Sequence, residues 1–508
     1  MNLPIPSNKD INRIAKENFF ELTTDELSAF EKLVPEYFDQ YEKLKNLNEP
    51  SKKIKSQKRM VGQIPTKKED PTNSIYRKFS IKEKSSGKLH GKRFGLKSCI
   101  SIKDMEMNSG SSVFEGYIAK KDATIVTRLL DSGAELVASL NMDHLGCSGG
   151  GNTCSYGVTL NPHNHNHLSG GSSSGSGAAL SYKDIDITIG GDQGGSIRIP
   201  ASWCGVVGLK PTYGLIPYTG IVGHDHSFDA TGPMANNVDD IAITLEVIAG
   251  YDGKDPRQKI PNNLNHNYTK NINNSIKGLS VGILSQGFDG ENSDPAVDKI
   301  VLESIEKGSE LGLKTRSINL PEHLNANIIF WGLCVEGLSK TLTSNLSGYH
   351  WEGEYDLDLM EFYNSARKNK SNSFSPQVKL LIIIGSYIKE KSNGLLYGKA
   401  QNLRMDFKKT YNNIFEEIDI LAMPTTPITA HPNNSNTNIV NYIKDGWSMM
   451  QNTVPFNLTG HPAISIPCGK INGLPVGLML VSKHFNEAQL LQVAKGYETI
   501  LNWKTNNK

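Results

Sequence analysis

The chain has 508 residues, a formal net charge of +2 and 37% hydrophobic residues. This is ordinary globular composition, and the near-neutral charge gives no support for nucleic-acid binding as a main role. The longest apolar run, Leu380–Ile384, is far shorter than the roughly 20 residues that cross a bilayer, and the N-terminus has no secretion-signal pattern. We therefore expect a cytoplasmic protein with no membrane partner and with its six scattered cysteines reduced.

The first elements expected along the chain are helices. Apolar residues recur at helical spacing between about residues 10 and 45, and Thr23-Thr24-Asp25-Glu26 is typical of a helix start. The polar stretch 46–75 contains three prolines and is expected to be a linker. These features predict a helical N-terminal region with its linker over residues 1–88.

Beyond about residue 94, short apolar runs alternate with helical stretches, a pattern that indicates an α/β domain. The clearest examples are strands at Ile185–Ile189 and Leu279–Leu284 and helices at Asp122–Ser132 and Pro295–Leu311. We expect one large catalytic domain over residues 89–508, with a mixed central sheet covered by helices on both sides.

Two Ser/Gly segments carry the candidate chemistry, Ser169–Gly177 and Gly190–Pro200. Strand-like and helix-like runs flank both closely, which argues against linkers, and Ser176 stands where a phosphate-binding loop requires lysine. The first segment also matches the G-x-S-x-G nucleophile elbow, with Ser173 central and His461 as a possible base. That alternative stays open.

The second segment favours Ser196 as a nucleophile. The backbone N–H groups of Gln193-Gly194-Gly195 precede it and can form a nest that points donors at a developing oxyanion. A lysine can activate such a serine only when neutral, which requires burial to lower its pKa from ~10.4 to about 7–8. Lys103 ends an apolar stretch and is the candidate, whereas Lys92 and Lys97 lie upstream in a more polar segment and are expected to tolerate alanine.

Together these residues resemble the amidase signature family. The resemblance is dense over Phe94–Gly253 and returns at Leu421–Pro427 and Thr459–Ala463. The family uses a Ser–cis-Ser–Lys triad, with the Gly171–Ser172 bond cis. The resemblance implies a nucleophile, a relay serine and a base, in that order Ser196, Ser172 and Lys103. It also implies an oxyanion hole on the amides of Gln193, Gly194, Gly195 and Ser196, and supporting roles for Ser173, Asp192 and Arg198.

Within the family, the sequence is most similar to the amidases that act downstream of nitrile hydratases. The shared features are Asp192-Gln193, the stretch Tyr397–Ala400 and the long helical N-terminal extension. This implies hydrolysis of small carboxamides to acid and ammonia by a homodimer that needs no cofactor, metal or nucleic acid. The alternative is the A subunit of a tRNA-dependent glutamyl/aspartyl amidotransferase, which typically has Thr where Gln193 stands and Gln where Ile199 stands.

Several further residues support weaker hypotheses. The Gly149-Gly150 loop sits where the family contacts the substrate's reacting group. Trp331, Trp447 and Met450 are candidates for a pocket around the acyl side of the substrate. For two further features a structural interpretation is preferred over a functional one. Cys147 is expected to be an inert buried thiol rather than a nucleophile. His163, His165 and His167 are expected to lie in an exposed loop rather than to bind a metal.

Overall fold

The computed structural model describes residues 3–47, 58–288, 290, 292–434 and 438–503. The chain divides into two compact units, Met1–Lys58 and Arg59–Lys508. The division falls earlier than the expected boundary at residue 89, because β1 (Ile75–Ile81) pairs with β3 (Glu135–Leu140) and so belongs to the sheet of the larger unit. No helix among the described residues is long and apolar enough to cross a membrane.

The described residues of the smaller unit form two helices, α1 (Asn8–Glu17) and α2 (Thr24–Lys45). Both begin with a capping box, in which a hydroxyl accepts a backbone N–H and a carboxylate three residues on accepts the hydroxyl residue's own N–H. The caps are Ser7 with Asp10 and Thr23 with Glu26, so the predicted helix start at Thr23 is confirmed.

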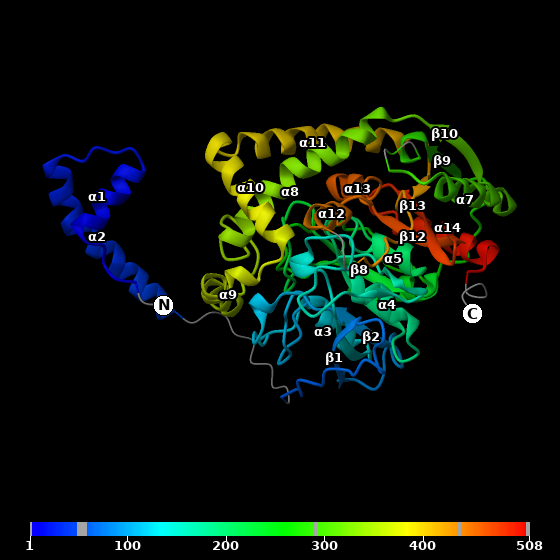
Figure 1. Ribbon diagram of the computed structural model, residues 1–508, viewed down its shortest axis with the longest axis horizontal. Helices are drawn as coiled ribbons and strands as arrows, with labels where there is room; N and C mark the ends of the chain where they lie inside the picture. The colour runs from blue at the N-terminus through cyan, green and yellow to red at the C-terminus, as the bar shows by residue number, and fades with distance from the viewer. Residues whose placement is uncertain (1–2, 48–57, 289, 291, 435–437, 504–508) are drawn as a thin grey trace. The chain divides into compact units, whose positions relative to one another are not determined.

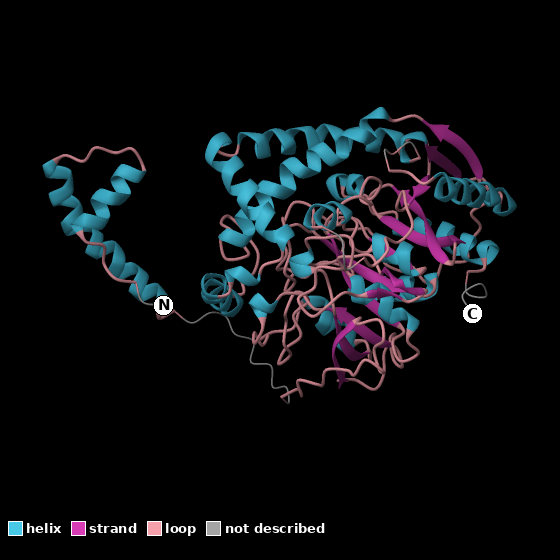
Figure 2. Ribbon diagram, in the orientation of Figure 1, coloured by secondary structure: helices cyan, strands magenta, loops and turns pink. Residues whose placement is uncertain are grey.

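The larger unit is built on an eleven-stranded mixed sheet (Figures 1 and 2). Its strands lie in the order β1, β3, β2 (Arg93–Lys97), β6 (Ile187–Asp192), β8 (Ala230–Ala235), β7 (Val207–Lys210), β12 (Ala463–Ile471), β13 (Leu474–Ser482), β11 (Ile420–Pro424), β9 (Ser280–Leu284) and β10 (Lys314–Ile318). β2 runs parallel to both β3 and β6, whereas β6, β8, β7, β12, β13 and β11 pair antiparallel in turn. A short hairpin of β4 (Leu160–Asn161) and β5 (Asn164–Leu168) lies apart from this sheet.

Helices cover the sheet on both faces, as predicted. One hydrophobic core joins the strands to α3 (Thr124–Asp131), α6 (Val238–Ile248), α7 (Pro295–Glu306) and α14 (Glu487–Leu501). A second core packs α5 (Arg198–Cys204), α8 (Ala326–Thr343), α11 (Leu395–Ile414) and α13 (Val454–Thr459) over the other face. In Figure 1, α8 and α11 lie beside α10 (Pro376–Ser392) in a helical layer. In the chain, α9 (Leu357–Asn369) lies between α8 and α10, and α12 (Ile439–Asp445) follows β11.

Strands β6, β7, β8, β11 and β13 are buried over their whole length, which explains their apolar and glycine-rich sequences. All six residues of β6 are buried, and Gly190 and Gly191 at its carboxyl end leave room for neighbouring side chains. Since β2 and β6 are parallel neighbours, their carboxyl ends meet at one edge of the sheet, where polar groups are commonly gathered. The short helix α4 (Ser174–Ala178) begins at the same place.

Candidate active site

Lys97 is the basic side chain that reaches Ser172. It is the last residue of β2, and its Nζ lies 2.8 Å from Ser172 Oγ and 3.2 Å from the Gly191 carbonyl oxygen. The residue is only 1% exposed. Burial lowers the pKa of Lys97 from its ordinary value, against the opposing effect of nearby acidic groups such as Asp143. A lower pKa enlarges the neutral fraction of the amine, which is the form that can accept a proton.

The prediction of Lys103 as the base is wrong. Its backbone N–H donates to Asp122 Oδ1 over 2.7 Å and its carbonyl oxygen accepts from Arg59 Nη1 over 3.4 Å, in a loop that has left the sheet. The chain turns immediately after β2, because the Ile100 N–H donates to the Lys97 carbonyl oxygen over 2.9 Å. The segment of Lys97 is the buried end of an interior strand and not a polar stretch, so the expectation that Lys97 tolerates alanine loses its basis.

Ser172 and Ser196 lie on segments that are joined through Ser173. The Gly171–Ser172 peptide bond is cis, and Ser172 is fully buried. The Ser173 N–H donates to the Ser196 carbonyl oxygen over 3.1 Å, and Ser173 Oγ donates to the Gly191 carbonyl oxygen over 3.0 Å. Lys97 and Ser173 thus share Gly191 as an acceptor, so the two Ser/Gly segments and the end of β2 form one site.

Asp192 and Arg198 form a buried ion pair behind this site. The carboxylate and guanidinium are 2.9 Å apart and inaccessible to solvent. Burial alone would raise the pKa of Asp192, but the charge of Arg198 and hydrogen bonds from Arg198 and Asn457 outweigh it and lower the pKa to about 2. Asn457 Nδ2 donates to Asp192 Oδ1 over 2.8 Å, and its Oδ1 accepts from Arg198 over 2.7 Å. The ionised carboxylate also accepts the N–H groups of Gly195 and Ile197, which fixes the backbone on both sides of Ser196.

The backbone amides before Ser196 divide into two groups. The Gly195 N–H donates to Asp192 Oδ1 over 2.9 Å, so its predicted place in the oxyanion hole is taken by an intramolecular bond. In the part of the chain that the structure describes, the amides of Gln193, Gly194 and Ser196 have no such acceptor. Gly195 has φ +131°, and a Cβ there would lie 2.3 Å from Thr453 Oγ1, which explains why glycine occupies the position.

Aromatic and sulfur-containing side chains stand beside Gly194. A Cβ on this glycine would lie 3.2 Å from Phe330 Cζ and 3.4 Å from Met450 Sδ. The rings of Trp331 and Trp447 pack edge to face with centroids 5.1 Å apart, and Trp331 follows Phe330 on α8. The structure therefore brings the three predicted pocket residues to one region, and it adds Phe330.

The Gly149-Gly150 loop lies next to Ser172. The Gly171 N–H donates to the Gly149 carbonyl oxygen over 2.7 Å, and the Gly150 N–H donates to Ser148 Oγ over 3.1 Å. A Cβ on Gly149 would meet Met449 Sδ at 2.6 Å. This loop therefore lies between the relay-serine segment and Met449, and its contact with substrate stays a prediction.

The residues of the alternative catalytic and metal-binding hypotheses have other contacts. Ser173 Oγ bonds to Gly191, whereas His461 Nδ1 contacts Thr459 Oγ1 and its ring packs 3.8 Å from His484. Burial raises the pKa of the Cys147 thiol well above its usual value. His163 Nε2 donates to the Cys204 carbonyl oxygen, and His165 is exposed. Within the described ranges, no group of three or more His, Cys, Asp or Glu side chains is arranged to hold a metal ion.

Sequence reasoning missed Lys97, Asn457, Thr453 and Phe330. Only Lys97 had a local signal: Phe94 and Leu96 alternate as in a strand, and Lys97 follows as the first polar residue at its carboxyl end. Asn457, Thr453 and Phe330 lie more than 130 residues from Ser196 in the chain and reach it only through tertiary packing.

Comparison with known proteins shows the family of the chain. The family model described as Amidase matches residues 61–491. The A subunit of glutamyl-tRNA(Gln) amidotransferase from Macrococcus caseolyticus is 36% identical over 431 residues, covering 83% of this chain and 86% of that protein. An enantioselective amidase from Rhodococcus rhodochrous is 33% identical over 501 residues, covering 97% and 95%. The solved structure of 6-aminohexanoate cyclic dimer hydrolase complexed with substrate has a TM-score of 0.73 and 25% identity, covering 83% and 87%.

A family model that spans most of the chain and relatives above 30% identity over most of its length leave one conclusion. The chain belongs to the amidase signature family and is a hydrolase of C–N bonds in amides.

Proposed function

We propose that this protein hydrolyses small carboxamides to carboxylic acid and ammonia, with Ser196 as nucleophile, Ser172 as relay and Lys97 as base. The observation that carries the proposal is the buried Lys97 amine 2.8 Å from Ser172 Oγ, on the same edge of the sheet as Ser196 and its open amides. A lysine kept from solvent and a serine preceded by free N–H donors supply the two things that attack on an amide requires.

The reaction then proceeds in two halves. Neutral Lys97 accepts a proton from Ser172, which accepts one from Ser196 as Ser196 Oγ bonds to the amide carbon. The amides of Gln193, Gly194 and Ser196 are the donors available for the oxyanion. When the C–N bond breaks, the proton returns through Ser172 to the leaving nitrogen and ammonia departs. Water loses a proton to the same relay, attacks the acyl-enzyme and releases the acid.

Two observations support small carboxamides as the substrate class. Phe330 and Met450 lie beside Gly194, and Trp331, which follows Phe330, packs against Trp447. Apolar side chains of this kind suit an aliphatic or aromatic acyl group. The enantioselective amidase matches 97% of this chain, so it matches most of Met1–Lys58 as well. This favours a stand-alone amidase, and the proposal places it among the nitrile-hydratase-associated amidases. The proposal includes a cytoplasmic enzyme with no nucleic-acid or membrane partner.

A homodimer is part of the same proposal. In α2 the apolar side chains Phe30, Leu33, Tyr37, Tyr41 and Leu44 are exposed at helical spacing. A contiguous apolar stripe of this kind is typical of an interaction surface.

The second candidate is the A subunit of an amidotransferase. The relative with 36% identity carries this name, as do several others at 33–36%, so sequence identity favours this candidate over the stand-alone amidase. That name describes a subunit of an amidotransferase for glutamyl-tRNA(Gln). If this candidate is right, the protein works with partner subunits and with tRNA, and the proposed absence of a nucleic-acid partner is wrong.

One experiment separates the two candidates. The purified full chain is given a panel of aliphatic and aromatic primary amides together with glutamine, and ammonia release is measured. The stand-alone amidase should turn over several panel amides without any partner. The amidotransferase subunit should leave the panel essentially unchanged and should use glutamine when the remaining subunits and glutamyl-tRNA(Gln) are added.

A further inference from the structure

His224 lies against the triad although the proposed mechanism does not use it. A Cβ on Gly146 would lie 2.7 Å from His224 Nε2 and 3.4 Å from Ser172 Oγ. The imidazole and the relay serine therefore both border the space that a side chain at Gly146 would fill. The residue is 7% exposed, so the ring is held inside the protein rather than in solvent.

The imidazole holds a turn that is unfavourable on its own. His224 Nε2 donates to the Leu145 carbonyl oxygen over 2.5 Å, and since a carbonyl can only accept, Nε2 carries the proton. Burial lowers the pKa of His224 to about 4, so the ring is neutral at physiological pH. Leu145 has φ +51° and Gly146 has φ +72°, and a non-glycine residue stays in this left-handed region only when its surroundings hold it there.

The held turn leads directly to the contacts around Ser172. The Asp143 N–H donates to the Ser172 carbonyl oxygen over 3.0 Å, and the Gly149 carbonyl oxygen accepts the Gly171 N–H over 2.7 Å. The Gly151 N–H closes the segment by donating to Asp143 Oδ2 over 2.9 Å. The backbone of residues 143–151 thus forms hydrogen bonds with Ser172 and with Gly171 before it, and the turn at Leu145 lies between the residues that make these two contacts.

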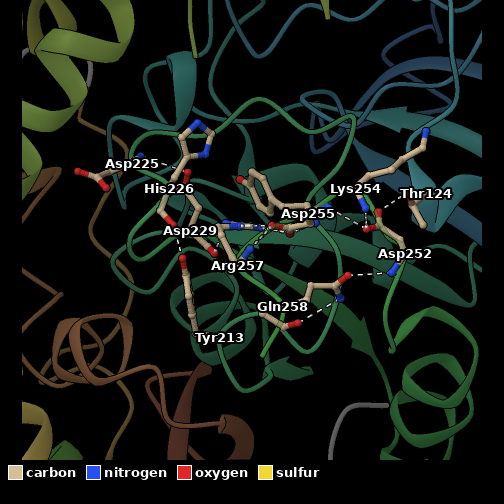
Figure 3. A network of polar contacts seen from close by, with 12 residues as sticks. Thr124, Tyr213, Asp225, His226, Asp229, Asp252, Lys254, Asp255, Arg257 and Gln258 are labelled. Atoms are coloured by element: carbon tan, nitrogen blue, oxygen red, sulfur yellow. Dashed lines mark hydrogen bonds and ion pairs between the residues drawn. The ribbon is translucent and has the colours of Figure 1, made fainter. Parts of the chain in front are cut away.

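The backbone of His224 is itself fixed by Asp229. The Asp229 carboxylate accepts the N–H of His224 over 2.9 Å and that of Asp225 over 3.1 Å. Asp225 and Asp229 belong to the polar network in Figure 3. Arg257 donates to the Asp229 carbonyl oxygen over 3.1 Å and pairs with Asp255. From α11, Tyr397 donates its hydroxyl to Asp225 Oδ2 over 3.0 Å, which gives a contact role to the Tyr397–Ala400 stretch.

We infer that His224 is a positioning residue: its Nε2–H fixes the turn at Leu145–Gly146 and thereby holds Ser172 Oγ against Lys97. The inference rests on the proposed roles of Ser172 and Lys97. It differs from a general packing role because one N–H group, at one position on the ring, carries the effect.

The test compares two substitutions that keep different atoms. In His224→Gln the amide nitrogen reaches about as far as imidazole Nε2, whereas in His224→Asn it reaches only as far as Nδ1. His226→Asn is the matched control, because the His226 ring stacks on Trp351 with centroids 4.0 Å apart. Measurements on the full chain are kcat and KM for an amide that the wild type hydrolyses, the melting temperature, and hydrogen exchange of the peptide covering 144–151.

His224→Asn should lower kcat at least about tenfold with KM within about twofold, and should speed exchange in 144–151 without speeding it elsewhere. His224→Gln should restore kcat to within about threefold of wild type, and His226→Asn should stay within about twofold. Wild-type kcat in His224→Asn, or an equal loss in His224→Asn and His224→Gln, would overturn the inference. Unchanged exchange in 144–151 would do so as well, and this readout stays valid even if Ser196→Ala shows that the proposed chemistry is wrong.

Discussion

Lys97 and Lys103 stand close together in the sequence, and each follows an apolar residue, yet they occupy opposite environments. Lys97 ends the central strand β2, is 1% exposed and faces Ser172. Lys103 is half-buried in the following loop, where its backbone contacts Asp122 and Arg59. A lysine can act as a base when its strand buries it and directs its amine toward a hydroxyl. A short run of apolar residues before the lysine does not predict this.

If Lys97 is the base, it acts through Ser172 on Ser196, so loss of the nucleophile Ser196 should lower kcat more than any other change. Ser196→Ala should lower kcat by about 10⁴-fold or more, because no acyl-enzyme can form. Ser173→Ala should cost only about 10–100-fold, since Ser173 joins the two segments through Gly191 but receives no acyl group. Steady-state ammonia release from both variants checks this order. A kcat that is lower in Ser173→Ala than in Ser196→Ala would favour the nucleophile-elbow assignment, with Ser173 as the nucleophile.

The next effect is on stability and comes from the ion pair behind the site. Arg198→Met leaves the Asp192 carboxylate buried without its partner and should lower the free energy of unfolding by about 3–5 kcal/mol. Arg93→Met is the control, because the Arg93–Asp186 pair is partly exposed and should contribute about 0–1 kcal/mol. Denaturant titration of both variants gives the two numbers. Equal losses would mean that the buried pair does not hold the Ser196 backbone.

Much of this architecture follows from sequence pattern, whereas the identity of the base does not. The helix start at Thr23, the strand at Leu279–Leu284 and the two Ser/Gly segments are local features, and the structure places them as expected. The place of Lys97, the proposed base, depends on the pairing of β2 with β6, a contact between segments about 90 residues apart that no local periodicity encodes. The hydrogen bond from the Gly195 N–H to Asp192 Oδ1 also cannot be predicted from the sequence, because it depends on the geometry of the turn after β6.

A smaller effect concerns stability against pH. The pKa of Lys97 is lowered in the folded protein, so between that value and about 10.5 the unfolded chain binds more protons, and this group makes folding more favourable as pH rises. Lys97→Met removes this penalty. The variant should therefore be more stable than wild type near pH 7, and its advantage should shrink as pH approaches about 10.5. Paired unfolding titrations between pH 6 and 10 measure the difference, and an advantage that is constant with pH would show that Lys97 is charged in the folded state.

The most direct test of the central claim is a matched pair of substitutions, Lys97→Met and Lys103→Met, assayed for kcat/KM on one small amide with circular dichroism to confirm folding. Methionine is close in length and shape to the aliphatic part of the lysine side chain and lacks the amine, so each variant asks whether that amine is the base. We expect Lys97→Met to lose about 10³-fold or more, while Lys103→Met stays within about twofold of wild type. A folded Lys97→Met enzyme with near-normal activity, or an inactive Lys103→Met enzyme, would contradict the assignment of Lys97 as the base.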